Sequence, residues 1–220
     1  MVGALQYLTM TTPDIAYAVH VVFQYLHAFR TTHLHAIKRT FRYLQGTLHH
    51  SLHLRPAATP SIIVAYSDAD LASCKDSCHS TTGYAVLFNP NLISWCSKKQ
   101  PTVSKSSTEV EYRTVAYIVA ETIWIRKLLH DLRLHLSTPT RVYYDKIRAS
   151  SMAVNPVQHD RSKHKAIDYH FVRECVAHGA LVVRYIPTKL QLVDVFTKGL
   201  FSKLLEFFRD NLSVRSSPID

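Results

Sequence analysis

The chain has 220 residues, 47% of them hydrophobic, which is enough for the packed core of one large domain or of one domain and a smaller piece. Its formal net charge of +10 favours a polyanionic partner, and nucleic acid is the first candidate. No apolar run approaches the length of a membrane span, and the start MVGALQYL carries neither a signal peptide nor a lipidation signal, so we expect no membrane association and no targeting signal.

The first 57 residues are predicted to be mainly helical. One helical pattern starts at Asp14 and runs through IAYAVHVVFQYLHAF, and a second, HLHAIKRTFRYLQGT, runs to Gly46. A short strand, SLHLR, follows. Residues 56–60, PAATP, have a proline at each end and small residues between them, a pattern typical of a linker. We therefore expect a helical segment over 1–57 and a separate domain over 58–199.

Three strands of one sheet are predicted next. SIIVAYS at 61–67 is a continuous apolar run, typical of a central strand that is buried on both faces. TGYAVLF at 82–88 and LISWCS at 92–97 follow, and the turn signal Asn-Pro-Asn at 89–91 separates them by the length of a hairpin loop. The three segments are therefore expected to form an antiparallel meander.

Helices and strands alternate in the rest of the domain. The expected elements are a helix from about Thr108 to Leu132, a strand at 141–144, a helix after Asp145, a helix near 163–178 that stops at Gly179, a strand at 181–186 and a short helix around 191–198. Antiparallel strands followed by alternating helices and strands are typical of an α/β fold with a mixed sheet. Residues 200–220 are expected to form a C-terminal helix and tail.

Acidic residues stand where predicted elements begin or end. Asp68 and Asp70 close the first apolar strand, Asp145 follows the strand at 141–144, and Asp194 opens the last short helix. Carboxylates at adjacent strand ends can converge on a hard divalent cation, which prefers oxygen ligands. Taken singly, each acid could also be an ordinary turn former or helix cap. Position alone does not choose between Asp68 and Asp70, because residues two apart in a strand point the same way.

The long predicted helix adds one further acid. At about 100° per residue, Glu111 falls on the same apolar face as Val115, Ile118 and Val119, whereas Glu109 falls on the flank. An acid on the buried face of a helix is costly unless it is paired, protonated or bound to a metal ion. Glu111 is therefore the candidate functional acid of this helix.

The four cysteines are expected to be reduced, because the absence of an address signal favours the cytoplasm or the nucleus. Cys74, Cys78 and His79 resemble half of a zinc site. Cys96 and Cys175 are isolated and provide no second pair of ligands, so the sequence disfavours a structural zinc ion.

Several segments together resemble a known family, the polyproteins of copia-type retrotransposons. Those similar to its ribonuclease H region are YSDAD (66–70), STTGYAVLF (80–88), LISWCSKKQPTVSKSSTEVEY (92–112), NPVQHDRSKHKAIDYHFVRE (155–174) and VDVFTKGL (193–200). The upstream VGALQYLTMTTPDIAYAV and HLHAIKRTFRYLQGT resemble the end of its reverse transcriptase part. The resemblance implies a ribonuclease H-like fold, a mixed five-stranded sheet flanked by helices and preceded by a small helical segment.

The resemblance also implies an activity and its ligands. The metal-binding acids of the family fall on Asp68, Glu111, Asp145 and Asp194, which decides for Asp68 over Asp70. Two Mg²⁺ or Mn²⁺ ions, about 4 Å apart, would serve the hydrolysis of the RNA strand of an RNA–DNA hybrid. The shape of the hybrid and the 2′-hydroxyl groups of its RNA strand would give the specificity.

Basic side chains are candidates for contacts with the nucleic acid backbone, although surface lysines are more often merely solvated. The candidates flank the hairpin and the starts of two helices: Lys98, Lys99, Lys105, Lys163, His164 and Lys165. With them, a catalytically inactive remnant could still bind nucleic acid, which is the alternative hypothesis. An integrase-like nuclease is disfavoured, because it places its glutamate last among the acids, and here glutamate is second.

The sequence departs from the family at three positions. Leu71 stands where tryptophan is usual, Thr12 where arginine is usual, and Lys146 where asparagine follows the metal-binding aspartate. A cation at position 146 would repel a metal ion at short range, so we expect weak or absent cleavage that Lys146→Asn restores. No Tyr-x-Asp-Asp motif is present, which excludes polymerase activity for this chain.

Overall fold

The structure is a computed structural model of the whole chain. It describes residues 2–56, 61–74, 76–104, 106–145 and 163–216, without the side chains of 163–166. Residues 57–60 of the predicted linker, Lys105, Lys146 and the helix expected after Asp145 lie outside this part of the chain.

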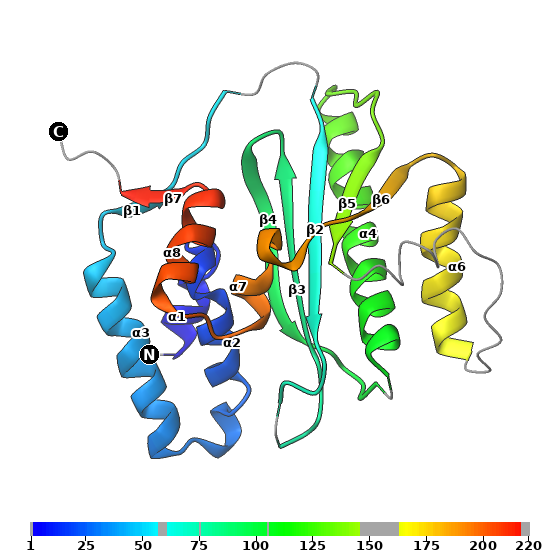
Figure 1. Cartoon of the computed structure of the whole chain (residues 1–220). Coiled ribbons are helices and arrows are strands. Elements are labelled where there is room, and N and C mark those ends of the chain that lie inside the picture. The colour runs from blue at the N-terminus through cyan, green and yellow to red at the C-terminus, as the bar shows by residue number, and fades with distance from the viewer. Residues whose placement is uncertain (1, 57–60, 75, 105, 146–162, 217–220) are drawn as a thin grey trace.

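A mixed sheet of five strands forms the centre of the molecule (Figure 1). In spatial order its strands are β4 (Asn91–Lys99), β3 (Thr81–Phe88), β2 (Ile63–Asp70), β5 (Thr140–Tyr144) and β6 (Leu181–Tyr185). β2, β3 and β4 are antiparallel neighbours, whereas β5 and β6 run parallel to β2. The apolar run of the sequence is therefore the central strand, as predicted.

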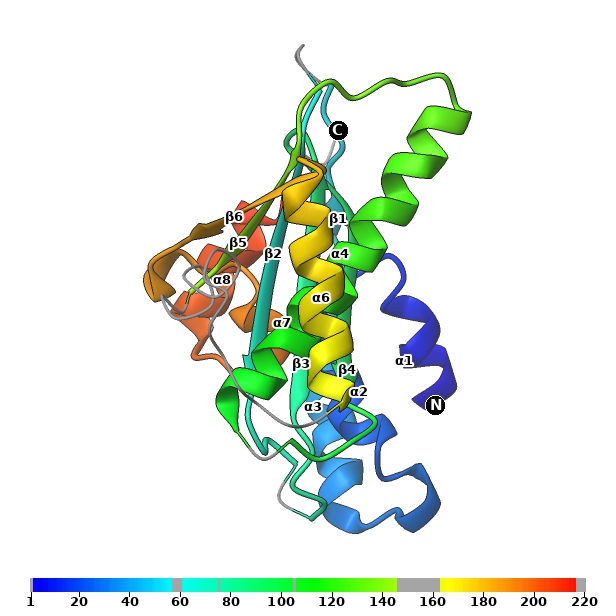
Figure 2. The same ribbon diagram turned by 90° about the vertical axis from the view of Figure 1, so that its right-hand side faces the viewer.

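Two helices, α4 (Ser107–Asp131) and α6 (Lys163–Ala177), cover one face of this sheet, and Figure 2 shows them side by side. Ile63 and Ala65 of β2 pack there with Val115 and Ile118 of α4 and Val172 of α6. Burial of such side chains stabilises the fold by roughly 1.5–3 kcal/mol each for the larger ones. This packing holds α4, and with it Glu111, at a fixed height on the sheet.

Three helices cover the opposite face: α2 (Ala16–Phe23), α7 (Asp194–Thr197) and α8 (Ser202–Asn211). Ala85 of β3 and Leu92 of β4 pack there with Ala16, Phe196 and Phe208. One apolar core thus joins both ends of the chain to the sheet. The N-terminal helix α2 and the C-terminal helix α8 therefore pack directly on the sheet.

The two ends of the chain also pair with each other, as β1 (His50–Leu52) is antiparallel to β7 (Val214–Ser216). The remaining helical elements are α1 (Val2–Leu8), α3 (Thr31–Gly46) and the short 3₁₀ turns η1 (Pro13–Ile15), η2 (Leu26–Ala28) and η3 (Thr188–Leu190). Trp95 of β4 anchors the N-terminal segment, since its indole Nε1 donates a hydrogen bond to the carbonyl oxygen of Thr9 at 2.8 Å.

The predicted fold class is confirmed: a mixed five-stranded sheet is flanked by helices and preceded by a mainly helical segment. The helix predicted to run from Asp14 towards Phe29 is interrupted after Phe23, where Tyr25 stacks on His33 of α3 and the chain turns. The strand predicted after α3 pairs with β7 instead of the main sheet.

The division of the chain at 57/58 and 199/200 stays a prediction. No described helix has both the length and the apolar composition of a membrane span.

Candidate carboxylate site

A recess lies where β2 extends beyond the residues that pair with its parallel neighbour β5. β5 pairs with β2 only from Val64 to Tyr66, while β2 continues to Asp70. Past that point the carbonyl oxygen of Ser67 accepts a hydrogen bond at 2.9 Å from Nε2 of Gln191, a side chain that is fully buried. The residues that line the recess come from β2, α4 and the end of β5: Ser67, Asp68, Ala69, Glu111, Thr114, Tyr144 and Asp145.

Asp68 is the most enclosed acid of the recess, with only 3% of its side chain exposed. Its Oδ2 accepts a hydrogen bond from Oγ1 of Thr197, which is the last residue of α7. Gly83 makes this approach possible, because it pairs with Asp68 across the strands and a Cβ there would lie 2.5 Å from Cγ2 of Thr197. A side chain at position 83 would therefore push α7 away from Asp68.

Asp194 and Lys198 complete this side of the site. The ammonium Nζ of Lys198 lies 2.9 Å from Oδ1 of Asp194 and 3.3 Å from Oδ2 of Asp68. The pKa of the Asp194 carboxyl is raised to about 6, chiefly by burial and also by the charges of Asp68 and Asp145, although the hydrogen bond from Lys198 and its charge oppose them. Burial lowers the pKa of the Lys198 ammonium, but the two carboxylates outweigh burial and the net pKa is raised.

The structure brings the four predicted acids together in two groups. Asp68, Glu111 and Asp145 line the recess, and Asp68 and Asp194 share one ammonium group. Glu111 is 6% exposed, so the helical periodicity placed it correctly on the buried face of α4. In the described part of the chain no three acidic, histidine or cysteine side chains are already close enough to hold a metal ion.

The donor set nevertheless fits a hard divalent cation by its chemistry. Asp68, Glu111 and Asp145 offer only carboxylate oxygens, the ligands that Mg²⁺ and Mn²⁺ prefer, and Mg²⁺ usually keeps several water molecules as well. An ion that binds with part of its water shell needs only one or two direct protein ligands. The recess therefore has the ligand chemistry for such an ion, but because it has no room for a water molecule as it stands, the side chains that line it must move apart to admit the ion.

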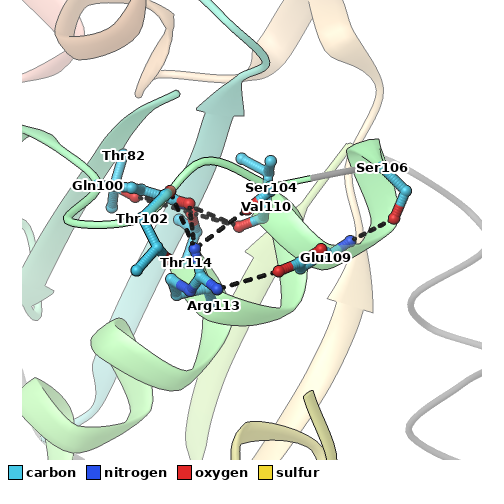
Figure 3. Close-up of polar contacts among 9 residues, drawn as sticks. All are labelled: Thr82, Gln100, Thr102, Ser104, Ser106, Glu109, Val110, Arg113 and Thr114. Carbon is cyan, nitrogen blue, oxygen red and sulfur yellow. Dashed lines mark hydrogen bonds and ion pairs between the residues drawn. The ribbon is translucent and has the colours of Figure 1, made fainter. Parts of the chain in front are cut away.

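A buried polar network fixes the loop between β4 and the start of α4 (Figure 3). Nε2 of Gln100 donates to Oγ1 of Thr82 at 2.9 Å and to the carbonyl oxygen of Val110 at 3.1 Å. Thr82 in turn lies 3.0 Å, oxygen to oxygen, from the hydroxyl of Thr114 on α4. These contacts join β3 to the residue directly before Glu111, so they set the position of Glu111 relative to β2.

Arg113 closes the same network from the helix side. Its guanidinium donates to Oε1 of Gln100 at 3.2 Å, to Oγ of Ser104 at 3.0 Å and to Oε1 of Glu109 at 3.1 Å (Figure 3). Glu109, the acid that the periodicity assigned to the flank, is thus the i,i+4 partner of Arg113.

Sequence reasoning missed four residues that support the site: Gln191, Thr197, Lys198 and Arg113. Two pairs left a usable signal, Asp194 with Lys198 and Glu109 with Arg113, since residues four apart on a helix are neighbours. In the segment VDVFTKGL the lysine stands four residues after the aspartate.

The predicted basic residues have unequal support. Lys98 is exposed. It pairs with Thr82, which in turn pairs with Ala69 of β2, so Lys98 lies two strand spacings, about 10 Å, from Ala69 across the sheet. Lys99 follows it at the end of β4. Lys105 lies outside the described residues, and of Lys163, His164 and Lys165 only the helical backbone at the start of α6 is described.

Comparison with known proteins gives two close relatives. The retrovirus-related Pol polyprotein from transposon RE1 of Arabidopsis thaliana is 46% identical over 218 residues, which are 99% of this chain and 15% of that polyprotein. The polyprotein from transposon TNT 1-94 of Nicotiana tabacum is 36% identical over 217 residues, 98% of this chain and 16% of that one. The chain thus spans about a sixth of the relatives it matches. No protein-family model matches it.

Solved structures resemble the chain in fold. The foamy viral protease-reverse transcriptase dRH, solved in complex with double-stranded DNA, is 12% identical, with a TM-score of 0.51 over 85% of this chain and 31% of that chain. LC11-RNase H1, isolated from compost, is 16% identical, with a TM-score of 0.41 over 62% of this chain and 92% of that chain. At such identities the likeness concerns the fold alone.

Proposed function

Because the chain belongs to the Pol polyproteins of copia-type retrotransposons and has a ribonuclease H-like fold, we propose that it hydrolyses the RNA strand of an RNA–DNA hybrid with the help of divalent metal ions. The observation that carries the proposal is the recess at the end of β2, which Asp68, Glu111 and Asp145 line together. Carboxylates that gather at one strand end, two of them buried, provide the oxygen ligands that a divalent cation prefers.

Each acid has a separate part in the proposed mechanism. Asp68 would be the central ligand, because it is shared by both groups of acids, and the hydrogen bond from Thr197 fixes the orientation of its carboxylate. Glu111 and Asp145 would provide oxygens from the other walls of the recess, and Asp194 from α7. Mg²⁺ or Mn²⁺ ions bound there supply the activation of water and the stabilisation of the leaving 3′ oxygen.

The hybrid would be recognised by its shape and charge. Lys98 lies at the level of Ala69 on the sheet and Lys99 at the level of Asp70, where they could bind a phosphate about half a duplex width from the recess. The net charge of +10 adds a general attraction to the nucleic acid backbone. Action on the RNA that is left after first-strand DNA synthesis, in the cytoplasm or the nucleus, is part of this proposal.

A second candidate function is nucleic-acid binding without catalysis. One observation favours it: the ammonium of Lys198 lies against both Asp68 and Asp194, where a metal ion would bind. A lysine that stayed there would leave the chain with its basic surface but with an obstructed site.

A cleavage assay separates the two functions. The full chain would be incubated with an RNA–DNA hybrid labelled on the RNA strand, and with RNA and DNA duplexes of the same sequence, in Mg²⁺, Mn²⁺ or EDTA. We expect cleavage that is weak because of Lys146, confined to the RNA strand of the hybrid and dependent on the divalent ion, with 5′-phosphate and 3′-hydroxyl ends. Binding of the hybrid without cleavage in either ion would favour the second function.

A further inference from the structure

We propose that Lys198 is a built-in counterion that competes with divalent metal ions for Asp68 and Asp194. The inference rests on the proposed metal site, and it concerns how tightly that site binds its ion. If so, the chain folds stably without a metal ion, and Lys198 weakens the binding of a metal ion to Asp68 and Asp194.

The geometry places one cation between two buried carboxylates. Nζ of Lys198 lies 2.9 Å from Oδ1 of Asp194 and 3.3 Å from Oδ2 of Asp68, and these side chains are only 11% and 3% exposed. Two enclosed carboxylates side by side repel each other strongly unless a positive charge lies between them. Lys198 provides that charge in the absence of a metal ion.

The lysine is held from the backbone so that it reaches both acids. It directly follows α7, four residues after Asp194, and its backbone N–H donates to the carbonyl oxygen of Asp194 at 3.0 Å. Phe196 and Gly83 fix α7 against β3, the first through the apolar core and the second through the close approach of Thr197. The fold therefore fixes the backbone position from which the ammonium of Lys198 reaches the two acids.

A metal ion and this ammonium cannot use the same oxygens together. Mg²⁺ binds carboxylate oxygens at about 2.0–2.1 Å, and an ammonium held about 3 Å from the same oxygens would be repelled by it. Lys198 has an exit, because 37% of its side chain is exposed and its four-carbon stem is flexible. Metal binding to Asp68 and Asp194 therefore requires the lysine to move out towards solvent.

The test compares Lys198→Met with the wild-type chain and with Lys127→Met as a control. Methionine keeps most of the length of the stem and removes the charge. Lys127 is exposed on α4, about 24 Å along the helix from Glu111, at 1.5 Å per residue. Calorimetric titration with Mg²⁺ and with Mn²⁺, without nucleic acid, would measure the dissociation constants of the three proteins, and thermal unfolding in EDTA would measure their stability.

We expect Lys198→Met to bind the ions about tenfold more tightly than the wild type, because one half-buried competing charge is lost. In EDTA we expect it to unfold at a lower temperature than the wild type, because its two carboxylates then lack a positive charge between them. Lys127→Met should match the wild type in both measurements. Equal or weaker metal binding by Lys198→Met would overturn the competition while leaving the nuclease proposal intact. Tighter metal binding without hybrid cleavage would support the competition and contradict the nuclease.

The wild-type chain provides an independent measurement if Lys198→Met does not fold without metal. Nitrogen-15 NMR at low temperature can detect a lysine ammonium that is held by hydrogen bonds, and Lys198→Arg would identify its signal. We expect this signal to shift or disappear as Mg²⁺ saturates the protein. A signal that persists unchanged at saturation would show that Lys198 stays in place, which would overturn the competition.

Discussion

Asp68→Asn is expected to reduce cleavage of the RNA–DNA hybrid by about a thousandfold or more, the scale seen when a group that acts in the transition state is removed. Asparagine has nearly the same shape, but its neutral amide is a poor ligand for a divalent cation. Because Asp68 belongs to both groups of acids, no other residue of the site can replace it. Initial rates on a labelled hybrid at saturating Mg²⁺ would measure the loss.

Asp70→Asn is the matched control for this variant. Asp70 ends the same strand on the same face, but it does not line the recess. Burial raises the pKa of Tyr17 on α2, and the charge of Asp70 raises that pKa by a smaller amount. Its cleavage rate should stay within about threefold of the wild type, a difference well under 1 kcal/mol in the barrier. A loss of cleavage in Asp70→Asn equal to that in Asp68→Asn would mean that the wrong acid of this strand has been chosen.

Phe196→Ala is expected to lower the free energy of unfolding by about 3–5 kcal/mol, as for the truncation of other fully buried phenylalanines. Phe196 lies on α7 with none of its side chain exposed, in the core that joins the sheet to Phe208 of α8 and Ala16 of α2. A cavity there would loosen both ends of the chain and the helix that carries Asp194. Urea unfolding followed by circular dichroism would measure the change.

Phe207→Ala is the control for this change in the core, because Phe207 adjoins Phe208 on α8 but is 46% exposed. We expect it to cost less than about 1 kcal/mol, since nearly half of its surface is already in contact with water. Equal losses for the two variants would contradict the assignment of α7 and α8 to a common core with the sheet.

The sequence was sufficient for the features that depend on local pattern. The apolar run at 61–67 predicted the central strand β2, and the periodicity of α4 predicted that Glu111 would be buried. Both follow from burial alone, which leaves a signal in neighbouring residues. The antiparallel meander was predictable for the same reason, because its turn and its strands are adjacent in the chain.

Features that depend on distant residues were beyond the reach of the sequence. β1 pairs with β7 at the other end of the chain, and three-residue strands have no distinctive pattern. Lys198 contacts Asp68 only because α7 packs on β3. The packing of α7 on β3 requires a residue without a side chain at position 83, which Gly83 provides. The prediction for Lys146 stays a prediction, because Lys146 lies outside the described residues, and the cation that the described residues place against Asp68 and Asp194 is Lys198.

Diffraction from crystals grown with Mn²⁺ would test most directly whether the acids at the end of β2 hold the metal ion. Data collected near the manganese absorption edge would locate the ion independently of the protein atoms. We expect a peak within about 2.1–2.2 Å of a carboxylate oxygen of Asp68 and of at least one of Glu111 and Asp145. The peak should be lost in Asp68→Asn. An ion bound away from Asp68, or no ion at a saturating Mn²⁺ concentration, would contradict the proposed site and the hydrolytic activity that depends on it.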